Sequence, residues 1–370
     1  MLSIKVTVLK AVVLAGGFAT RLRPLSCSRP KTLFPIVNKP LLQWIFEGLS
    51  NNEVTEVILA VNALTQFHIK QQKPPKSGLK IKYAIDPSKM PLGTAGPIKN
   101  TEKAIGHTEP FIVLNGDIFA DINYKQLMDT HTKSNALATI TLCKIDDPSR
   151  YGIAEIEKGN RIKNFIEKPK KEQVSTNLIN AGIYVLSPKI FDYIPKGKQC
   201  SIEREIFPIL AKEHKLFSYM INGLWMDIGN PEEYLQTNKI VLDNLVTTNK
   251  LKTPKNIETK KPIAIDKKCN IGKKTIIGPY AIIGKNVTIG DNVQIYDSIV
   301  FPGTKINDNT TINGAIIGEN VDVGKNVRVN TGCVIADQVK IKDGTNITRE
   351  FSICPGKEIS ETILKRNVIC

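Results

Sequence analysis

An aliphatic residue recurs every six positions through the last third of this chain, and this periodicity constrains the fold more than any other feature. The two in-phase series are Ile265, Ile271, Ile277, Ile283, Ile289 and Ile295, and later Ile317, Val323, Val329, Ile335, Ile341 and Ile347. A glycine often follows the aliphatic residue, and a small or β-branched residue stands four positions after it. Such a six-residue unit forms one short face of a triangular coil, and stacked coils bury a core that no single unit could bury. The pattern therefore predicts a parallel β-helix.

The six-residue phase slips between Ile295 and Ile317, because Ile306 and Ile312 fall out of step with both series. The slip predicts an irregular coil or a small loop. The repeats on either side resemble those of left-handed parallel β-helices. No histidine follows His214, so acyl transfer with a histidine base is not expected from this region. We expect its end coils and flat faces to serve stability and subunit contacts, and hence a homo-oligomer.

Upstream of the repeats, strand-like and helix-like segments alternate. Short apolar runs at residues 10–15, 56–61, 79–84 and 110–114 are separated by helix-length stretches, which predicts an α/β domain with a Rossmann-like, mostly parallel sheet. A polar stretch with two prolines over 247–262 is typical of a linker. A chain of 370 residues exceeds one typical core. The predicted organisation is therefore an α/β domain over 1–246, a linker over 247–262 and a left-handed β-helix domain over 263–370.

Charge, apolar runs and cysteine spacing limit the kinds of binding partner and cellular setting that we expect for this chain. The net charge of +16 suits an anionic ligand, but the lysines are spread along the chain and no nucleic-acid motif appears, so no nucleic-acid partner is expected. No apolar run approaches the length of a membrane span, and Lys5 and Lys10 interrupt the apolar start, which favours a first strand over a signal peptide. The seven widely spaced cysteines lack a CxxC pair, which predicts reduced thiols in a cytoplasmic protein rather than a disulfide framework or a zinc site.

Near the start of the chain, two glycines and then fixed cations directly follow a strand-like run. Residues 14–24 are Leu-Ala-Gly-Gly-Phe-Ala-Thr-Arg-Leu-Arg-Pro, and Pro-Lys follows at 30–31. Gly16 and Gly17 let backbone N–H groups approach a polyanion, Arg21 can hold phosphate oxygens with its planar fork, and Lys31 adds a point charge. Neither the GxGxxG spacing nor the P-loop motif is present. The pattern predicts a phosphate-binding loop at the carboxyl end of a strand, with an ordinary tight turn as the alternative.

This string, together with later motifs, resembles the sugar-1-phosphate nucleotidyltransferases, the pyrophosphorylases that make nucleotide sugars. The later motifs are Leu92-Gly93-Thr94-Ala95-Gly96, Asn115-Gly116-Asp117, Tyr151-Gly152, Glu167-Lys168-Pro169, Asn180-Ala181-Gly182 and Trp225-Met226-Asp227-Ile228-Gly229. The resemblance covers about residues 9–240, and the strings at 201–208 and 223–229 look most like mannose-1-phosphate guanylyltransferases. It implies that GTP and mannose 1-phosphate yield GDP-mannose and pyrophosphate. Glucose-1-phosphate thymidylyl- or uridylyltransferase activity is one alternative, and a non-catalytic, translation-factor-like subunit of the same fold is another.

The resemblance also implies a role for each motif residue. Arg21 and Lys31 would be catalytic, Asp117 and Asp227 would hold Mg²⁺, Leu14, Ala15, Gly16, Gly17, Gly93 and Thr94 would bind the nucleotide, and Gly152, Glu167, Lys168 and Asn180 would bind the sugar phosphate. In this chemistry a phosphate oxygen attacks the α-phosphorus while pyrophosphate leaves, so cations and positioning supply the rate. Each motif also has a plain structural explanation, because aspartates after strands are often caps or turns, and Asp227 lies in a short turn-like string.

Two further residues qualify this interpretation. Ala19 stands where many members of the family have glycine, and its methyl group disfavours a positive φ. Asp86 lies shortly before the Gly93 loop, where its carboxylate could accept hydrogen bonds from the N–H donors of guanine. A simple Asp-Pro turn explains Asp86 equally well.

Overall fold

The computed structural model describes residues 9–17, 19–72, 77–87, 91–248, 258–362 and 368–370. It forms two compact units: the first contains Met1–Gly17 and Leu41–Asp227, and the second contains Phe18–Pro40 and Ile228–Cys370. The chain therefore leaves the first unit after the glycine pair, returns to it at Leu41, and ends in the second. Most of the predicted linker, residues 249–257, lies outside the described residues.

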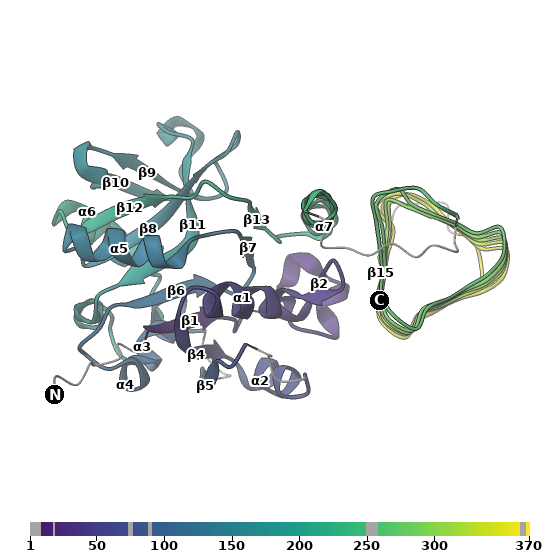
Figure 1. Cartoon of the computed structure of the whole chain (residues 1–370), viewed down its shortest axis with the longest axis horizontal. Helices are drawn as coiled ribbons and strands as arrows, with labels where there is room; N and C mark the ends of the chain where they lie inside the picture. The colour runs from purple at the N-terminus through teal and green to yellow at the C-terminus, as the bar shows by residue number, and fades with distance from the viewer. Residues whose placement is uncertain (1–8, 18, 73–76, 88–90, 249–257, 363–367) are drawn as a thin grey trace. The chain divides into compact units, whose positions relative to one another are not determined.

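A nine-stranded sheet is the framework of the first unit (Figure 1). Its strands are β1 (Leu9–Leu14), β4 (Val54–Val61), β5 (Lys80–Ile85), β6 (Phe111–Asn115), β8 (Ala138–Lys144), β9 (Gly152–Ile156), β10 (Ile162–Glu167), β11 (Leu178–Leu186) and β12 (Leu216–Met220). The order is β10-β9-β11-β6-β1-β4-β5, with β8 pairing both β11 and β12. Strands β6, β1, β4 and β5 run parallel, whereas β11 is antiparallel to β6, β8 and β9. The four predicted strands are confirmed as β1, β4, β5 and β6, in a sheet whose other half is largely antiparallel.

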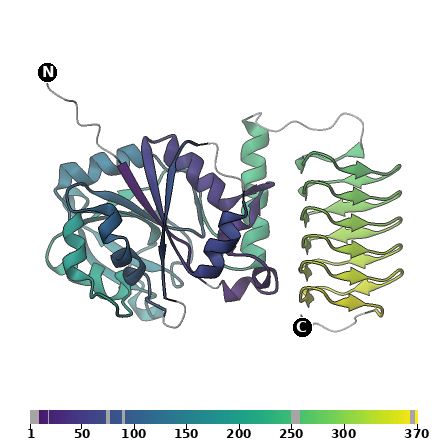
Figure 2. The ribbon, with the colours of Figure 1, turned by 90° about the horizontal axis from the view of Figure 1, so that it is seen from below.

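Helices flank this sheet (Figure 2). They are α1 (Leu41–Ser50), α2 (Ala63–Lys70), α3 (Ala95–Asn100), α4 (Glu102–Ile105), α5 (Tyr124–Ser134) and α6 (Phe207–Lys212), with the short turns η4 (Lys158–Asn160), η5 (Lys171–Gln173), η6 (Pro188–Tyr193) and the π-helical η7 (Ile202–Ile206). Val12, Ile58 and Val113 on the central strands are at most 1% exposed, as expected for parallel strands covered on both faces. None of the described helices combines the length and apolarity needed to cross a bilayer.

Three parallel sheets form the faces of a triangular β-helix in the second unit (Figure 1). The first face contains β14 (Glu258–Thr259), β17 (Ile276–Ile277), β20 (Gln294–Tyr296), β23 (Thr311–Asn313), β26 (Arg328–Val329) and β29 (Asn346–Ile347). The second contains β15 (Ile263–Ile265), β18 (Ala281–Ile283), β21 (Ile299–Val300), β24 (Ile316–Ile317), β27 (Val334–Ile335), β30 (Ser352–Ile353) and β32 (Val368–Ile369). The third contains β16 (Asn270–Ile271), β19 (Thr288–Ile289), β22 (Lys305–Ile306), β25 (Asp322–Val323), β28 (Lys340–Ile341) and β31 (Glu358–Ile359). These sheets confirm the predicted β-helix.

The phase slip in the repeat comes from two shortened corners. Equivalent positions on the first and second faces are six residues apart at Ile276 and Ile282, but five apart at Gln294 and Ile299 and again at Thr311 and Ile316. The out-of-step residues Ile306 and Ile312 are each at most 1% exposed and keep their inward places. The predicted irregularity is therefore confirmed, but it is a loss of one residue at each of two corners, and the small loop offered as an alternative is wrong.

The outer side of the second face is apolar, unlike that of the third face. Successive strand residues point to opposite sides, so the residues next to the inward row point outward. On the second face these are Ala264, Ile282, Ile299, Ile316 and Val334, all at most 4% exposed. On the third face they are Thr288, Lys305, Asp322, Lys340 and Glu358, all exposed. The second face is therefore covered.

The cover comes from helix α7 (Pro231–Thr247) and from residues 19–40, which contain η1 (Thr20–Leu22), η2 (Leu25–Cys27), η3 (Lys31–Leu33), β2 (Pro35–Ile36) and β3 (Lys39–Pro40). The ring of Phe301, just after β21, makes edge contacts with the rings of Phe34 and Tyr234, at centroid distances of 6.5 and 6.4 Å. Asn38 Nδ2 donates a hydrogen bond to the carbonyl of Ile283 at 2.9 Å. Both segments thus pack on the second face.

A disulfide joins Cys354 to Cys370, so the prediction that all seven cysteines are reduced thiols is wrong for this pair. The Cys354 N–H also donates to the carbonyl of Ile369 at 2.7 Å, which adds the C-terminal strand β32 to the second face. The sequence spacing gave no sign of this pair, because stacking of the coils brings the two residues together. The other five cysteines are free, and Cys143, Cys200 and Cys333 are buried.

Ala19 adopts the left-handed conformation that its methyl group disfavours, with φ 47° and ψ 44°. The loop therefore keeps a backbone shape that suits glycine better than alanine. We predict that Ala19→Gly raises the free energy of unfolding by about 0.5–1 kcal/mol, measured by denaturant unfolding. Ala104→Gly, inside α4, is the matched control and should lower stability. A lower stability of Ala19→Gly would contradict the prediction.

Candidate active site

The predicted nucleotide-binding loop lies at the carboxyl edge of the parallel strands. The carbonyl of Leu14, at the end of β1, accepts a hydrogen bond from the Gly116 N–H at 2.8 Å. Two residues further on, the carbonyl of Gly16 accepts a hydrogen bond from Asn62 Nδ2 at 2.9 Å. Gly116 follows β6 and Asn62 follows β4, so the loop from Leu14 to Gly17 lies where open α/β sheets bind their ligands.

Asp86 lies beside this loop. A Cβ atom placed on Gly16 would be 3.5 Å from Asp86 Oδ2, while Asn100 Nδ2 donates to the other oxygen, Oδ1, at 3.0 Å. Burial raises the pKa of Asp86, and the hydrogen bond from Asn100 opposes that shift. One carboxylate oxygen therefore faces the predicted nucleotide-binding loop.

Gly93 and Thr94 are tied to the segment that follows Cys200. Gly93 has φ +73°, and a Cβ there would collide with the Cys200 carbonyl, so a glycine is required whatever ligand binds. The Thr94 hydroxyl donates to Glu203 Oε2 at 2.5 Å and accepts from the Ile202 N–H at 3.0 Å. The nucleotide-binding prediction thus falls on a loop whose shape is fixed by its contacts with η7.

Glu203 connects this loop to the predicted sugar side of the site. Its Oε1 accepts a hydrogen bond from the Tyr184 hydroxyl at 3.3 Å, and that hydroxyl in turn accepts from Asn180 Nδ2 at 3.0 Å. Glu203 is 8% exposed and Tyr184 fully buried. Hydrogen bonds therefore run from Thr94 through Glu203 and Tyr184 to Asn180. Only membership of the 201–208 string marked Glu203 in the sequence, and nothing marked Tyr184.

Three of the four predicted sugar-phosphate residues meet where β9 pairs with β10 and β11. The β9–β10 register places Gly152 opposite Glu167, and a Cβ on Gly152 would lie 2.6 Å from Glu167 Oε2. Ile153 pairs with Ile179, so Asn180 is the next residue along β11. The missing side chain of Gly152 makes room for the Glu167 carboxylate.

Lys168, the fourth of these residues, is exposed and follows β10 with a φ of 51°. Its N–H donates to the Tyr151 carbonyl at 3.1 Å. A lysine in the left-handed region is uncommon, and such strained backbone often occurs at functional sites.

The surroundings of Glu167 raise the pKa of its carboxyl group. Burial raises its pKa to about 7, with a further rise from the nearby Glu203, while Lys168 and Arg204 oppose the shift. Near neutral pH a population of protonated and ionised forms therefore coexists. The ionised form only accepts hydrogen bonds, whereas the protonated form can also donate one.

Asp117 and Asp227 lie at the same end of the antiparallel pair formed by β7 (Ile118–Ala120) and β13 (Trp225–Asp227). Asp227 lies opposite Ile118, which directly follows Asp117, and both aspartates are half-buried. The turn-like setting expected for Asp227 is wrong, because it ends a strand. The two predicted metal ligands are thus brought close together by strand pairing.

Two carboxylates fit Mg²⁺, which is usually held by one or two carboxylates together with substrate phosphates and waters. No group of three or more His, Cys, Asp or Glu side chains placed to hold a metal occurs among the residues that the structure describes. A metal at Asp117 and Asp227 would therefore take its remaining ligands from substrate and water.

Trp225 links the aspartate pair to the sugar side. Its Nε1 donates to the Ala181 carbonyl at 2.9 Å, and its ring meets the edge of the Tyr151 ring at 5.5 Å. Gly182 has φ +70°, and a Cβ there would be 2.7 Å from Asn115 Nδ2. This part of β11 therefore packs against the end of β6, next to Asp117.

The predicted catalytic cations belong to the second unit. Arg21 is exposed in η1, and Lys31 opens η3 with 8% of its surface exposed. The residues of the first unit named above form one connected group, and the roles of Arg21 and Lys31 in the site stay predictions.

Comparison with known proteins agrees with both halves of the chain. The family model described as nucleotidyl transferase matches residues 10–244, and the one described as GMPPB C-terminal domain matches residues 259–369. The chain is 38% identical over 242 residues to the mannose-1-phosphate guanyltransferase of Saccharomyces cerevisiae, covering 64% of this chain and 66% of that protein. It is 39% identical over 240 residues to mannose-1-phosphate guanylyltransferase 1 of Arabidopsis thaliana, with the same coverage of 64% and 66%. The chain thus spans about 66% of the length of these relatives.

Solved structures match about two-thirds of the chain. HddC from Yersinia pseudotuberculosis is 29% identical with a TM-score of 0.53, covering 63% of this chain and 99% of that one. A UDP-glucose pyrophosphorylase complexed with UDP-glucose is 23% identical with a TM-score of 0.56, covering 64% and 99%, and shares the fold. Since the first family model spans more than half of the sequence and its motif residues gather at one edge of the predicted sheet, this chain belongs to the nucleotidyl transferase family.

Proposed function

We propose that this protein is a mannose-1-phosphate guanylyltransferase, which joins the GMP part of GTP to mannose 1-phosphate and releases pyrophosphate. The observation that carries the proposal is the connected group formed by Gly152, Glu167, Asn180 and the aspartate pair, in a chain whose relatives bear that name. The choice of mannose and guanine as substrates rests on the names of the relatives. The proposed transfer of a nucleotidyl group rests on the residues of the site.

In the proposed reaction, an oxygen of the sugar phosphate attacks the α-phosphorus of GTP and pyrophosphate leaves in line. Backbone N–H groups of Gly16 and Gly17 bind the triphosphate, and Arg21 and Lys31 balance the charge of the leaving pyrophosphate. Glu167 accepts hydrogen bonds from sugar hydroxyls. No protein nucleophile is needed, because the residues act by orientation and by charge.

Asp117 and Asp227 would hold Mg²⁺, which when bound supplies positive charge at the α-phosphate. The half-buried setting of both carboxylates suits ligands shared between protein, phosphate oxygens and water.

Guanine selection is assigned to Asp86 in this proposal. Its Oδ2 faces Gly16 while Oδ1 is taken by Asn100, so one oxygen is placed to accept from a guanine N–H. The related HddC, 29% identical with a TM-score of 0.51, has been solved in complex with GMP-PN.

The test is pyrophosphate release from GTP, dTTP and UTP with mannose 1-phosphate or glucose 1-phosphate. GTP with mannose 1-phosphate should exceed every other pair by at least about tenfold. Asp86→Asn should reduce that preference, whereas Asp192→Asn, at an exposed position of η6, should not. Better turnover with dTTP or UTP would overturn the guanine assignment. Turnover with no pair at all would favour the non-catalytic subunit.

The raised pKa of Glu167 predicts how binding of mannose 1-phosphate depends on pH. Sugar hydroxyls donate to the ionised carboxylate, so affinity should rise with pH through about 7, where half of the Glu167 carboxyl groups are ionised, and level off once most have lost their proton. Dissociation constants measured from pH 5.5 to 8.5 check this. Glu167→Gln should bind more weakly and lose that part of the pH dependence, leaving only the titration of the sugar phosphate, whose second pKa is about 6. Identical pH profiles for the two proteins would contradict the prediction.

A further inference from the structure

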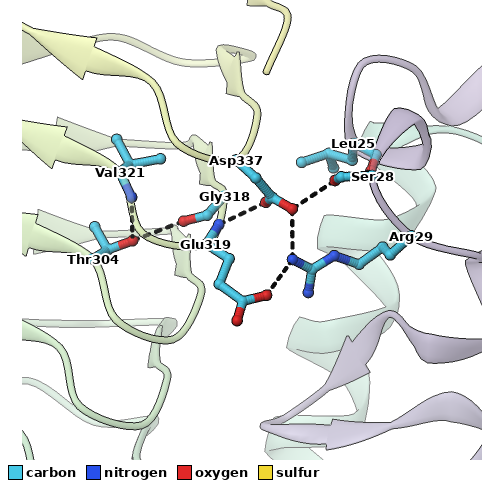
Figure 3. A network of polar contacts seen from close by, with 8 residues as sticks. All are labelled: Leu25, Ser28, Arg29, Thr304, Gly318, Glu319, Val321 and Asp337. Atoms are coloured by element: carbon cyan, nitrogen blue, oxygen red, sulfur yellow. Dashed lines mark hydrogen bonds and ion pairs between the residues drawn. The ribbon is translucent and has the colours of Figure 1, made fainter. Parts of the chain in front are cut away.

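Arg29 ties residues 19–40, here called the signature segment, to two corners of the β-helix (Figure 3). Its Nη2 lies 2.5 Å from Glu319 Oε2 and 2.6 Å from Asp337 Oδ2, and its guanidinium carbon lies 5.0 Å from the ring centroid of Phe301. The hydroxyl of Ser28 donates to the same Asp337 oxygen at 2.6 Å. The side chains of Arg29 and Asp337 are only 15% and 10% exposed, a setting in which charge-assisted hydrogen bonds are strong.

Asp337 uses its two carboxylate oxygens for different purposes. Oδ1 accepts from the Glu319 N–H at 2.7 Å, across one coil of the β-helix, and Oδ2 serves Ser28 and Arg29. The same kind of bond between coils occurs at Asp343, whose Oδ1 accepts from the Lys325 N–H at 2.7 Å. Asp343 lies at an exposed corner, away from the signature segment. The bond made by Asp337 Oδ1 is therefore a common feature of the coils, whereas the bonds that Oδ2 accepts from Ser28 and Arg29 are particular to this corner.

Arg29 and its contacts with Glu319 and Asp337 are here called the anchor. In the sequence, Arg29 lies between the two predicted catalytic cations, Arg21 and Lys31. Towards Arg21, the Ser26 hydroxyl donates to the Ala19 carbonyl at 2.8 Å, and Leu22 and Leu25 are at most 1% exposed. Lys31 follows Arg29 by two residues. Arg29 therefore lies close in sequence to both cations, in a segment that these contacts help to hold.

A second attachment holds the far end of the signature segment. The N–H of Val37 donates to Asn238 Oδ1 at 2.8 Å, and the Tyr234 hydroxyl donates to the Pro35 carbonyl at 2.5 Å. Phe34 packs edge-on against Phe301. These contacts also account for the buried aliphatic outer row of the second face.

We propose that the β-helix positions the signature segment for turnover, with Arg29, Glu319 and Asp337 as positioning residues. This inference rests on the proposed function, and it gives the β-helix a part in catalysis beyond stability and assembly. Arg21 and Lys31 must meet a triphosphate in one geometry, and a loop held beforehand in that geometry avoids the entropic cost of ordering it during the reaction. The coils supply a rigid support that a loop alone lacks.

The test compares Asp337→Asn with Asp343→Asn in the full chain. Asp337→Asn keeps an oxygen for the inter-coil bond but replaces Oδ2 with an amide nitrogen, which cannot accept from Arg29, whereas Asp343→Asn changes only an exposed corner. Two quantities are measured: amide hydrogen exchange of residues 19–40, and kcat with KM for both substrates. For Asp337→Asn we expect exchange at least about tenfold faster and kcat at least about tenfold lower, with the KM for mannose 1-phosphate unchanged. Asp343→Asn should match the wild type within about twofold.

The two readouts separate the possible failures. Unchanged exchange in Asp337→Asn would overturn the anchor, and faster exchange with wild-type kcat would overturn its role in turnover. Should Asp337→Asn lower the melting midpoint of the chain, Glu319→Gln is read in the same way, since the Glu319 side chain is 40% exposed and its backbone bond to Asp337 stays. Absence of turnover in the wild type would refute the proposed function, and exchange would still support or overturn the anchor.

Discussion

Asp117→Asn and Asp227→Asn are each expected to reduce turnover by at least about 100-fold, while the melting midpoint changes little. Each substitution keeps the shape of the side chain and removes one charged ligand from a pair that strand pairing places together. Because the two carboxylates would act as one unit, the double variant should be little worse than either single one. The measurement is Mg²⁺-dependent pyrophosphate release at saturating substrates.

A matched control lies at the other end of the same strand. Asp121 follows β7 and is exposed, so Asp121→Asn makes the same chemical change in the same pair of strands without touching the predicted metal ligands. It should keep wild-type turnover. Near-wild-type rates in both Asp117→Asn and Asp227→Asn would mean that these aspartates serve only local structure, and the catalytic interpretation would have to be replaced.

Sequence patterns predicted the parts of this molecule in which local spacing determines structure. The six-residue period reports which side chains point into the β-helix, because each repeat must bury the same position. The shortened corners after β20 and β23 were visible only as a loss of phase. A missing residue and a small loop shift the phase in similar ways, and only the register of neighbouring coils distinguishes them.

The candidate site was predictable wherever a motif carried it, and unpredictable wherever distant residues meet. Motifs identified Glu167 and Asn180, but nothing in a linear pattern indicates that Tyr184 would join Asn180 to Glu203. The same holds for Arg29, whose carboxylate partners lie about 300 residues away in the sequence. Such contacts follow from how the sheets and coils are assembled, and local propensity contains no information about them.

Glu203→Gln is expected to impair both substrates at once, because Glu203 holds the nucleotide loop through Thr94 and the sugar side through Tyr184. Both hydroxyls donate to this buried carboxylate, and an amide can accept through only one of its two ends. One buried donor then loses its acceptor, at a cost of about 1–3 kcal/mol. We expect the KM values for GTP and mannose 1-phosphate to rise and kcat to fall, each by about tenfold. Glu205→Gln is the control, since Glu205 is exposed in the same turn and accepts from the Ser201 N–H.

A pH profile distinguishes this coupling from a simple loss of stability. The charge of Glu203 helps to raise the pKa of Glu167 to about 7. Removing that charge should lower the Glu167 pKa, so the rise in affinity for mannose 1-phosphate should occur at a lower pH in Glu203→Gln than in the wild type. Loosened packing would also lower this pKa, because it admits water to Glu167. Thr94→Val removes a hydrogen bond of the loop but keeps the Glu203 charge, so it is the comparison and should shift the midpoint less. An unchanged midpoint together with unchanged KM values would show that the two halves of the site are held independently of Glu203.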